Sequence, residues 1–294
     1  MIRRLVGVVA LSLSLVGTSA CAGSSSPQGR TGTAPSTVTS SPHTSSAPSR
    51  PASTPRLERA VDTVRKAHPD ADIGVAFAPV GTTAKVRFIG EPTTLVAWST
   101  IKVPLALAVI RAGNGHSSSD DIRRALTASD NEAAARLWDH LGDGDGDVAS
   151  AAVERQLRRG GDGRTRVPPQ VTVPGYSPFG QATWRLTDQT RFTAALPCLS
   201  GSAAVIEDMS HVVDGQRWGL GGMSGAKYKG GWGSTPDGYV VRQLGLVPAE
   251  GAKGATAVTL QVRTGTHGQG TGIADELVAA LRTNRDELPV GTCS

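Results

Sequence analysis

The sequence is poor in the features that metal centres, nucleotide enzymes and membrane spans require. Cysteine occurs three times in 294 residues, and neither Cys198 nor Cys293 has a histidine or cysteine neighbour at the spacing of zinc ligands. The apolar run Leu5 to Val16 is too short to span a bilayer. No glycine-rich phosphate loop stands between a strand pattern and a helix pattern. We therefore expect neither a bound metal nor another cofactor.

Acidic residues are absent from the first 55 positions. Within this stretch, 1–20 combines two arginines, the apolar run and a group of small residues, which is the pattern of an export signal. Small residues leading straight into Cys21 resemble the lipobox of bacterial lipoproteins, and this resemblance implies that Cys21 is lipidated. We predict a signal peptide at 1–20 and an extracytoplasmic protein anchored to the bacterial cell membrane through Cys21. A cleaved secretory signal with an incidental cysteine is the alternative.

Residues 21–55 are dominated by Ser, Thr, Pro, Gly and Ala. Such a segment buries too little apolar surface to offset its ordering entropy, so we predict a disordered tether before a folded domain at 56–294. Four of the 30 basic residues and none of the 25 acidic ones precede position 56, so the domain holds 26 basic and 25 acidic side chains, a net charge of +1. A near-neutral domain does not favour nucleic acid as a partner.

Two cysteines, Cys198 and Cys293, lie in the domain. In an exported protein such a pair can form a disulfide, which here would join the C-terminal tail to the body of the domain. Two free thiols are the alternative.

Hydrophobic periodicity in 56–294 predicts an α+β fold. The chain begins with a helical pattern at 57–68 and two strand patterns at 73–79 and 85–90, and an apolar helix starts near Ser99. Further helices are predicted at 120–141 in two pieces, 147–159, 188–196, 203–213 and 272–282, strands at 227–232, 239–246 and 255–263, and a long loop at 160–180. Strands from both ends imply a five-stranded antiparallel sheet flanked by the terminal helices, with a separate all-helical lobe.

The stretch "AWSTIKVPLALAVI" places Lys102 three residues after Ser99, at the head of a segment with no other charge. Residues three apart share a helix face, and apolar surroundings favour the neutral form of a lysine. A neutral lysine can accept the proton of a nearby hydroxyl and so convert serine into a nucleophile. Because a serine and a lysine at this spacing also occur by chance, the pair alone is a weak signal.

Two further groups are weak when taken singly. Ser129, Asp130 and Asn131 stand at the join of two predicted helices, where all three residue types are also favoured as caps and turns. Lys229-Gly230-Gly231 lies on a predicted strand, where the small residues are equally compatible with an ordinary bulge or a close strand approach.

In this order, Ser99-x-x-Lys102, Ser129-Asp130-Asn131 and Lys229-Gly230-Gly231 resemble the S-x-x-K, S-D-N and K-T-G motifs of class A β-lactamases and penicillin-binding proteins, a serine D,D-peptidase-like superfamily. The resemblance covers 56–294, and the order of predicted elements matches the β-lactamase-like fold. It implies a site between the two lobes that acts on β-lactams or on cell-wall peptides of the D-Ala-D-Ala type.

The resemblance also implies a role for each matching residue. The catalytic set would be Ser99 as the acylated nucleophile, Lys102 as its proton acceptor, Ser129 as the proton relay, and Lys229, which would hold Ser129 and the substrate carboxylate electrostatically. The substrate-binding set would be Asn131, Gly231 and Trp232, with the backbone N–H groups of Ser99 and Trp232 binding the oxyanion. Trp138, Trp184 and Trp218 are expected in the core instead.

Two departures from the family pattern limit this interpretation. Gly230 stands where the family has threonine or serine, so a hydroxyl that would bind a substrate carboxylate is missing. The loop 161–183 offers only Asp162 where class A β-lactamases carry a glutamate that activates the deacylating water, and Glu154 lies on the preceding helix. We therefore expect poor deacylation. A catalytically degenerate module that binds cell-wall peptide or a protein partner is the alternative, and in either case we expect a monomer.

Overall fold

The computed structural model describes residues 54–293 except 84, 92 and 252. These residues belong to one compact unit, Ser49–Ser294. The predicted signal peptide, the lipidation of Cys21 and nearly all of the predicted tether lie outside the described residues. In the part that is described, none of the helices combines the length and the apolar character that a membrane span needs.

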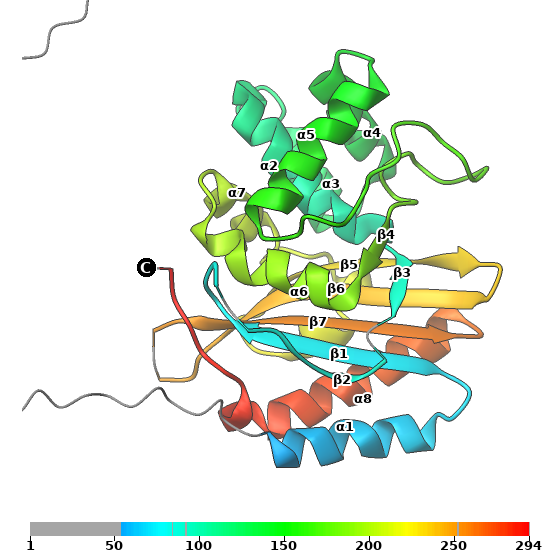
Figure 1. The fold of residues 1–294 in the computed structure, drawn as a ribbon, viewed down its shortest axis with the longest axis vertical. Helices are drawn as coiled ribbons and strands as arrows, with labels where there is room; N and C mark the ends of the chain where they lie inside the picture. Colours follow the sequence, from blue (N-terminus) through cyan, green and yellow to red (C-terminus); the bar gives the residue numbers. More distant parts are fainter. Residues whose placement is uncertain (1–53, 84, 92, 252, 294) are drawn as a thin grey trace, which may run out of the picture. The chain divides into compact units, whose positions relative to one another are not determined.

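A five-stranded antiparallel sheet forms the base of the described domain (Figure 1). Its strands lie in the order β2 (Arg87–Gly90), β1 (Asp72–Pro79), β7 (Ala255–Thr264), β6 (Gly238–Pro248), β5 (Lys227–Thr235). The first strand in the sequence therefore pairs with the last, with Val75 opposite Leu260. This pairing brings both ends of the domain into one sheet, as predicted, and it leaves β5 as an edge strand.

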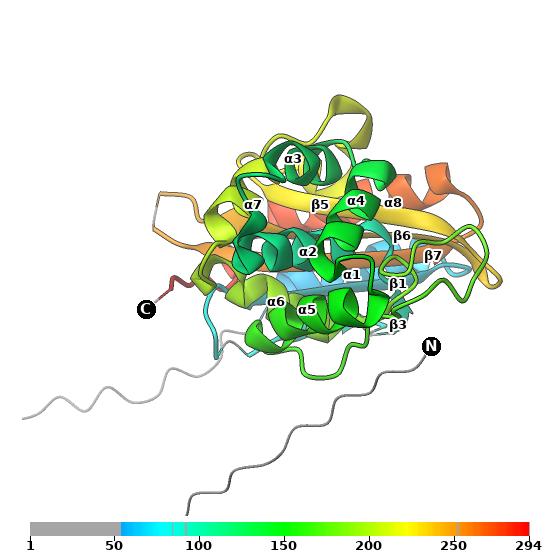
Figure 2. The ribbon, with the colours of Figure 1, turned by 90° about the horizontal axis from the view of Figure 1, so that it is seen from above.

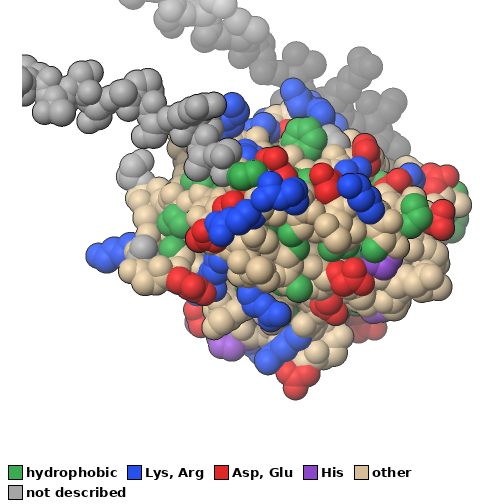
Figure 3. All heavy atoms as spheres, turned by 90° about the horizontal axis from the view of Figure 1, so that it is seen from below, with side chains coloured by type: hydrophobic (Ala, Val, Ile, Leu, Met, Phe, Trp, Pro, Cys, Tyr) green, Lys and Arg blue, Asp and Glu red, His purple; other side chains and the backbone are tan. Residues whose placement is uncertain are grey.

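The terminal helices α1 (Pro55–Ala67) and α8 (His267–Thr283) cover the lower face of the sheet in the view of Figure 1. Leu57, Val61 and Val64 recur at helical spacing and are buried, so α1 turns this stripe to the sheet. The opposite face of the helices is solvated: Figure 3 shows basic and acidic side chains interspersed over it. One contact there joins His68, the residue after α1, to Glu276 on α8, with 2.9 Å between the His68 Nε2 and a carboxylate oxygen of Glu276.

The upper face of the sheet carries the helical lobe (Figures 1 and 2). The lobe consists of α2 (Lys102–Val109), α3 (Ser119–Thr127), α4 (Asn131–Gly142), α5 (Gly146–Arg159), α6 (Leu186–Ala195) and α7 (Ser202–Asp208). All eight residues of α2 are buried, which explains why its sequence has no polar stripe. The predicted α+β architecture, a five-stranded antiparallel sheet with flanking terminal helices and a separate helical lobe, is confirmed.

Two predicted helices differ from the structure in their bounds, and one small sheet was not predicted. The helix predicted at 203–213 ends at Asp208, because the chain turns to pair the Val213 N–H with the carbonyl of Thr127. The closing helix begins at His267 rather than 272, since the Thr266 hydroxyl accepts the N–H of Gln269 and caps it earlier. A small sheet of β3 (Thr94–Val96) and β4 (Thr183–Arg185) was not expected, because three-residue strands give no readable period.

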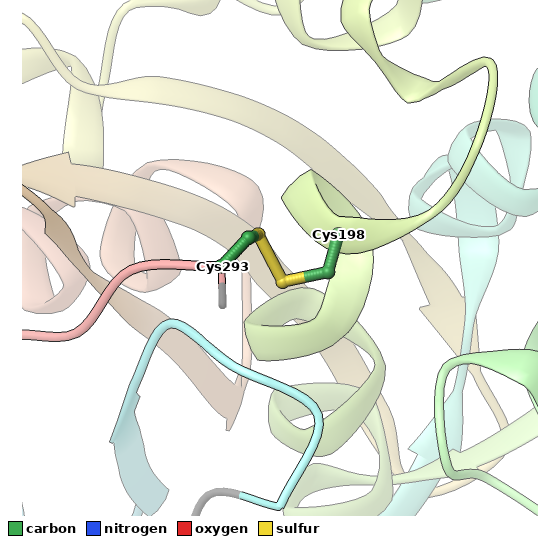
Figure 4. Close-up of a disulfide and its surroundings, with 2 residues drawn as sticks. All are labelled: Cys198 and Cys293. Atoms are coloured by element: carbon green, nitrogen blue, oxygen red, sulfur yellow. A yellow bond between two sulfur atoms is a disulfide. The ribbon is translucent and has the colours of Figure 1, made fainter.

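Cys198 and Cys293 form a disulfide, with 5.3 Å between their Cα atoms (Figure 4). The bond joins the end of the chain to the 3₁₀ turn Leu196–Cys198 that follows α6. The alternative of two free thiols is therefore excluded in this structure.

Replacing both cysteines by serine is expected to lower the free energy of unfolding by about 2–4 kcal/mol, because the bond closes a loop of 95 residues in the unfolded chain. Urea unfolding of the oxidised protein and of the double variant measures this difference. Reduction of the wild type should reproduce the loss, and an unchanged midpoint would show that the bond does not constrain the unfolded chain.

Candidate active site

The nucleophile candidate Ser99 lies on the 3₁₀ turn Trp98–Ile101, and α2 begins only at Lys102. The predicted start of a regular helix near Ser99 is therefore three residues too early. Trp98 has a positive φ of 48°, an uncommon conformation for a residue with a side chain. This conformation turns the chain sharply from β3 into the helix and holds Ser99 at the head of α2.

Ser99 and Lys102 line one cavity of about 320 Å³. Its other described walls come from the nucleophile turn, the start of α4, the long loop after α5 and β5. They comprise Trp98, Asn131, Gly175, Tyr176, Ser177, Phe179, Gly180 and Trp232. The cavity thus contains the proposed nucleophile, its proton acceptor and two of the three residues predicted to bind substrate. Gly231, the third, lies on β5 beside Trp232.

Lys102 is 1% exposed, and acceptors from the join of α3 and α4 surround its ammonium group. Its Nζ donates to the Ser129 carbonyl at 2.6 Å, to Asn131 Oδ1 at 2.7 Å and to the Ser129 Oγ at 3.4 Å. Burial lowers the pKa of Lys102 from 10.5 to about 7, although the charge of Asp130 opposes this shift. A large fraction of Lys102 is therefore neutral at pH 7 and can accept a proton.

The turn at Ser129-Asp130-Asn131 acts both as a helix cap and as a source of polar partners for Lys102, the two roles that the sequence left open. Asp130 caps α4 by accepting the N–H of Ala133, and it also pairs with Arg124. Ser129, at a φ of 57°, and Asn131 are the residues whose side chains contact Lys102. The structural cap and the polar partners of the lysine thus come from adjacent residues of one turn.

Lys229 approaches the same hydroxyl from the sheet. It is fully buried, and its Nζ donates to the Ser129 Oγ at 2.9 Å and to the Gly230 carbonyl at 2.7 Å. Burial, with the charge of Lys102 as a second cause, holds the pKa of Lys229 well below 10.5. Ser129 therefore connects two lysines that come from opposite lobes.

Gly231 lies directly against the nucleophile turn. A Cβ atom at this position would lie 2.9 Å from the backbone N of Ser99 and 3.0 Å from that of Thr100. Only glycine allows this close approach of β5 to the turn. Gly230 has a different neighbour. A Cβ atom at this position would lie 3.1 Å from the indole ring of Trp218, so a side chain there would be tightly packed against that ring.

The loop between α5 and β4 forms one wall of the cavity, and its aromatic contacts were not predicted. The Tyr176 hydroxyl donates to the Ser234 carbonyl on β5 at 2.5 Å, and the Tyr176 ring packs on Trp98 with 4.6 Å between ring centroids. Gln181 shapes the loop by accepting the N–H groups of Thr172 and Val173. The only sequence feature that could have indicated this wall is the presence of Tyr176 and Phe179 within a Gly- and Pro-rich segment.

The carboxylates considered as deacylation bases are held elsewhere. Asp162 is buried, and it accepts the Trp184 indole N–H at 2.8 Å and the Thr165 N–H at 3.1 Å. Glu154 accepts the Val167 N–H and pairs with Arg158. Among the described residues that line the cavity, none is a carboxylate. Nor do the described His, Cys, Asp and Glu side chains form a group of three or more suited to a metal.

A buried arginine supports the nucleophile turn from below. Arg242 on β6 donates to the carbonyls of Leu95 and Trp184 and to Gln189 Oε1 at 2.7 Å. The Gln189 amide in turn donates to the Thr100 Oγ, next to Ser99, at 2.9 Å. Burial lowers the pKa of Arg242 to about 9. The Arg242 guanidinium group thereby links the sheet to α6, and Gln189 extends this link from α6 to the nucleophile turn.

Arg242→Met is expected to lower the free energy of unfolding by about 2–4 kcal/mol, because the buried Gln189 oxygen and the freed lone pairs of the carbonyls lose their donor. Urea unfolding measures the change. Arg158→Met, which removes a half-exposed arginine paired within α5, is the control and should change stability by less than about 0.5 kcal/mol. Equal effects in the two variants would contradict the supporting role of Arg242.

The comparisons with known proteins come from structure rather than from sequence. No protein-family model and no curated protein sequence matches the chain. Solved structures do match: a mutant of PBP-A, in an acyl-enzyme complex with penicillin G, is 17% identical with a TM-score of 0.62, and the match covers 82% of this chain and all of that one.

Two β-lactamase neighbours agree with this match. A β-lactamase from Streptosporangium roseum is 16% identical with a TM-score of 0.59, and the match covers 80% of this chain and all of that one. The ancestral class A β-lactamase of Gram-negative bacteria is 18% identical with a TM-score of 0.59, and the match covers 77% of this chain and 99% of that one. The described domain therefore has the fold of class A β-lactamases and PBP-A.

Proposed function

We propose that the domain is a serine acyl-transfer enzyme that acts on β-lactams or on cell-wall peptides of the D-Ala-D-Ala type. The observation that carries this proposal is the state of Lys102. Its pKa of about 7 makes it a proton acceptor at neutral pH, and it lines the same cavity as Ser99.

In the proposed reaction, the Ser99 Oγ bonds to the substrate carbonyl carbon while its proton passes to the neutral Nζ of Lys102. The backbone N–H groups of Ser99 and Trp232 hold the developing oxyanion. When the intermediate collapses, the C–N bond breaks and the leaving nitrogen takes the proton of the Ser129 hydroxyl. Lys102, 3.4 Å from that hydroxyl, restores the proton, and the ester on Ser99 remains.

Deacylation of this ester is proposed to be slow. Activation of a water molecule requires a base aimed at the acyl carbonyl. Asp162 and Glu154 are the two carboxylates that the sequence offered as candidate bases. Both accept hydrogen bonds from backbone or indole N–H groups, and neither lines the cavity.

The second candidate is a degenerate module that binds cell-wall peptide or a protein partner. One observation favours it: the hydrogen bonds of Lys102 are complete within the protein, so the same network can persist as a buried polar core. In this case Ser99 would bind but would not form a covalent bond.

Intact-mass measurement over time after mixing the purified protein with a penicillin distinguishes these candidates, with Ser99→Ala as the control. A persistent adduct on the wild type alone is the expected result. A transient adduct with drug turnover would overturn slow deacylation. No adduct after hours at high drug concentration would favour the binding module.

We also propose that the mature protein is a monomeric lipoprotein, held on the outer side of the bacterial cell membrane by a lipid on Cys21. The expected result is that the wild type enters the detergent phase on phase separation and that Cys21→Ala stays in the aqueous phase. A wild type without a lipid mass at Cys21 would support the ordinary secretory signal instead.

A further inference from the structure

A second cavity lies in the helical lobe, on the side where α2, α3 and α7 pack against one another (Figure 2). Its volume is about 550 Å³, and it shares no described lining residue with the cavity beside Ser99. Lys102 lines that first cavity at the start of α2, and Ile110 lines the second one directly after the end of α2. Eight residues of helix span about 12 Å, so the two cavities lie at opposite ends of α2.

Part of the lining of this second cavity is apolar. Ile110 follows α2, Ile122 comes from α3 and Ala204 comes from α7. Ile122 is buried, and Ile110 is partly buried against the core of the lobe. A Cβ atom on Gly115 would lie 3.2 Å from the Ile110 Cγ1, so the glycine leaves this side of Ile110 uncovered. These aliphatic side chains favour the apolar part of a ligand.

Carboxylates outnumber basic groups in the rest of the described lining. Asp120, Glu207 and Asp208 are the acidic residues, and His116 and Arg123 are the basic ones. Asp208 is half-buried, whereas the other four are exposed, so water screens the charge of Asp208 least. The cavity therefore favours a positively charged group close to Asp208.

Asp208 is also the carboxylate that lacks a cation. Asp120 accepts a hydrogen bond from the Arg123 guanidinium at 2.9 Å, and a carboxylate oxygen of Glu207 lies 3.7 Å from the Lys227 Nζ. The Asp208 carboxylate forms neither a hydrogen bond nor an ion pair with any residue that the structure describes. A partner for it must come from outside the described domain.

The end of α7 strengthens this negative potential. Glu207 and Asp208 occupy the last turn of α7, where the helix dipole disfavours carboxylates, and no basic residue stands in that turn. Burial raises the pKa of Asp208 because its carboxylate loses water, although the charges of Arg123 and His211 act in the opposite direction. A cation bound there would replace the lost water and would also be stabilised by the helix end.

We propose that this cavity binds an organic cation with an apolar body, whose ammonium group pairs with Asp208 while its body packs on Ile110 and Ile122. A neutral ligand of the same shape would leave the carboxylate without a partner, and an anion would meet its charge. This site is separate from the cavity beside Ser99, so the proposal does not depend on acyl transfer.

Titration of the full-length protein with tryptamine, tryptophol and indole-3-propionate tests the proposal. The three compounds share an indole body and carry an ammonium, a hydroxyl and a carboxylate group. NMR of ¹³C-labelled isoleucine methyl groups reports the site, with Ile73 on β1 as the reference. Tryptamine is expected to shift the methyl signals of Ile110 and Ile122 and to bind at least about fivefold more tightly than the other two. Equal affinity for either of them, or no shift at Ile110 and Ile122, would overturn the proposal.

Two pairs of variants test the residues. Asp208→Asn should weaken tryptamine binding at least about fivefold, and the control Asp214→Asn, which changes an exposed carboxylate outside the cavity, should not. Ala204→Phe should fill the cavity and also weaken binding, whereas Ala203→Phe places the same ring on the neighbouring exposed residue outside the lining.

Unchanged affinity in Asp208→Asn would overturn the role of that carboxylate, and equal losses in the two phenylalanine variants would contradict binding inside the cavity. The comparison of the three compounds on the wild type decides the proposal even if a variant does not fold.

Discussion

Replacing Lys102 by methionine is expected to reduce the rate of Ser99 acylation by about 10²–10⁴-fold. Methionine fills a similar volume but cannot accept the proton of Ser99, and the Ser129 carbonyl and Asn131 Oδ1 lose their donor. The measurement is the rate of adduct formation with a penicillin, read by intact mass. Lys227→Met is the control, because Lys227 lies at the start of β5, is not among the described residues that line the cavity, has a side chain that is 38% exposed and pairs with Glu207.

The same assignment fixes the pH dependence of the wild type. Lys102 acts as proton acceptor only in its neutral form, and its pKa is about 7. The acylation rate should therefore rise about tenfold per pH unit below pH 7 and level off above it. A rate that falls above pH 7 would indicate that the ammonium form is the active one, and an activity that persists in Lys102→Met would assign the proton transfer to another group.

Gly231→Ala is expected to reduce acylation by about 10²–10³-fold, comparable to the loss of one oxyanion-hole donor. The new methyl group would lie 2.9 Å from the Ser99 nitrogen and 3.0 Å from the Thr100 nitrogen. Both are backbone atoms, so no flexible side chain can move aside, and β5 or the nucleophile turn must shift. The distance between Ser99 and the N–H of Trp232 would change with it.

Gly215→Ala is the matched control, since a Cβ there meets no atom within 4 Å. It should leave the acylation rate unchanged. The rate loss in Gly231→Ala should exceed what its stability explains, because overpacking costs about 1–3 kcal/mol and most molecules remain folded. If Gly231→Ala is acylated at the wild-type rate, the close approach of β5 to Ser99 is not required for acylation.

Much of the candidate site was already predictable from local sequence. Lys102 is the single charge at the head of an apolar run, and a buried helix in that position can tolerate a lysine only if its ammonium is paired or neutral. The turn at 129–131 was predictable for a related reason: its three polar residues interrupt a helical pattern. Both are properties of neighbouring residues.

Contacts between residues far apart in the chain were harder to predict from the sequence. The Ser129 hydroxyl receives Lys229 from 100 positions away, and the sequence predicted this contact only through the resemblance of three motifs. The Tyr176 contacts with Trp98 and with the Ser234 carbonyl gave no periodic signal, because they come from an irregular loop. Gly230 was interpreted as a missing hydroxyl, and only the position of the Trp218 ring gave a steric reason for the glycine.

The sequence by itself determined the α+β class, the pairing of strands from both ends and the buried helix at Lys102, because these follow from hydrophobic period and local charge. The set of polar site residues came from the sequence only through the resemblance of three motifs to a known family. Tertiary structure decided the lowered pKa of Lys102, the shared hydroxyl of Ser129 and the aromatic wall beside Gly230. These depend on burial and on distances between elements far apart in the chain, which no local pattern encodes.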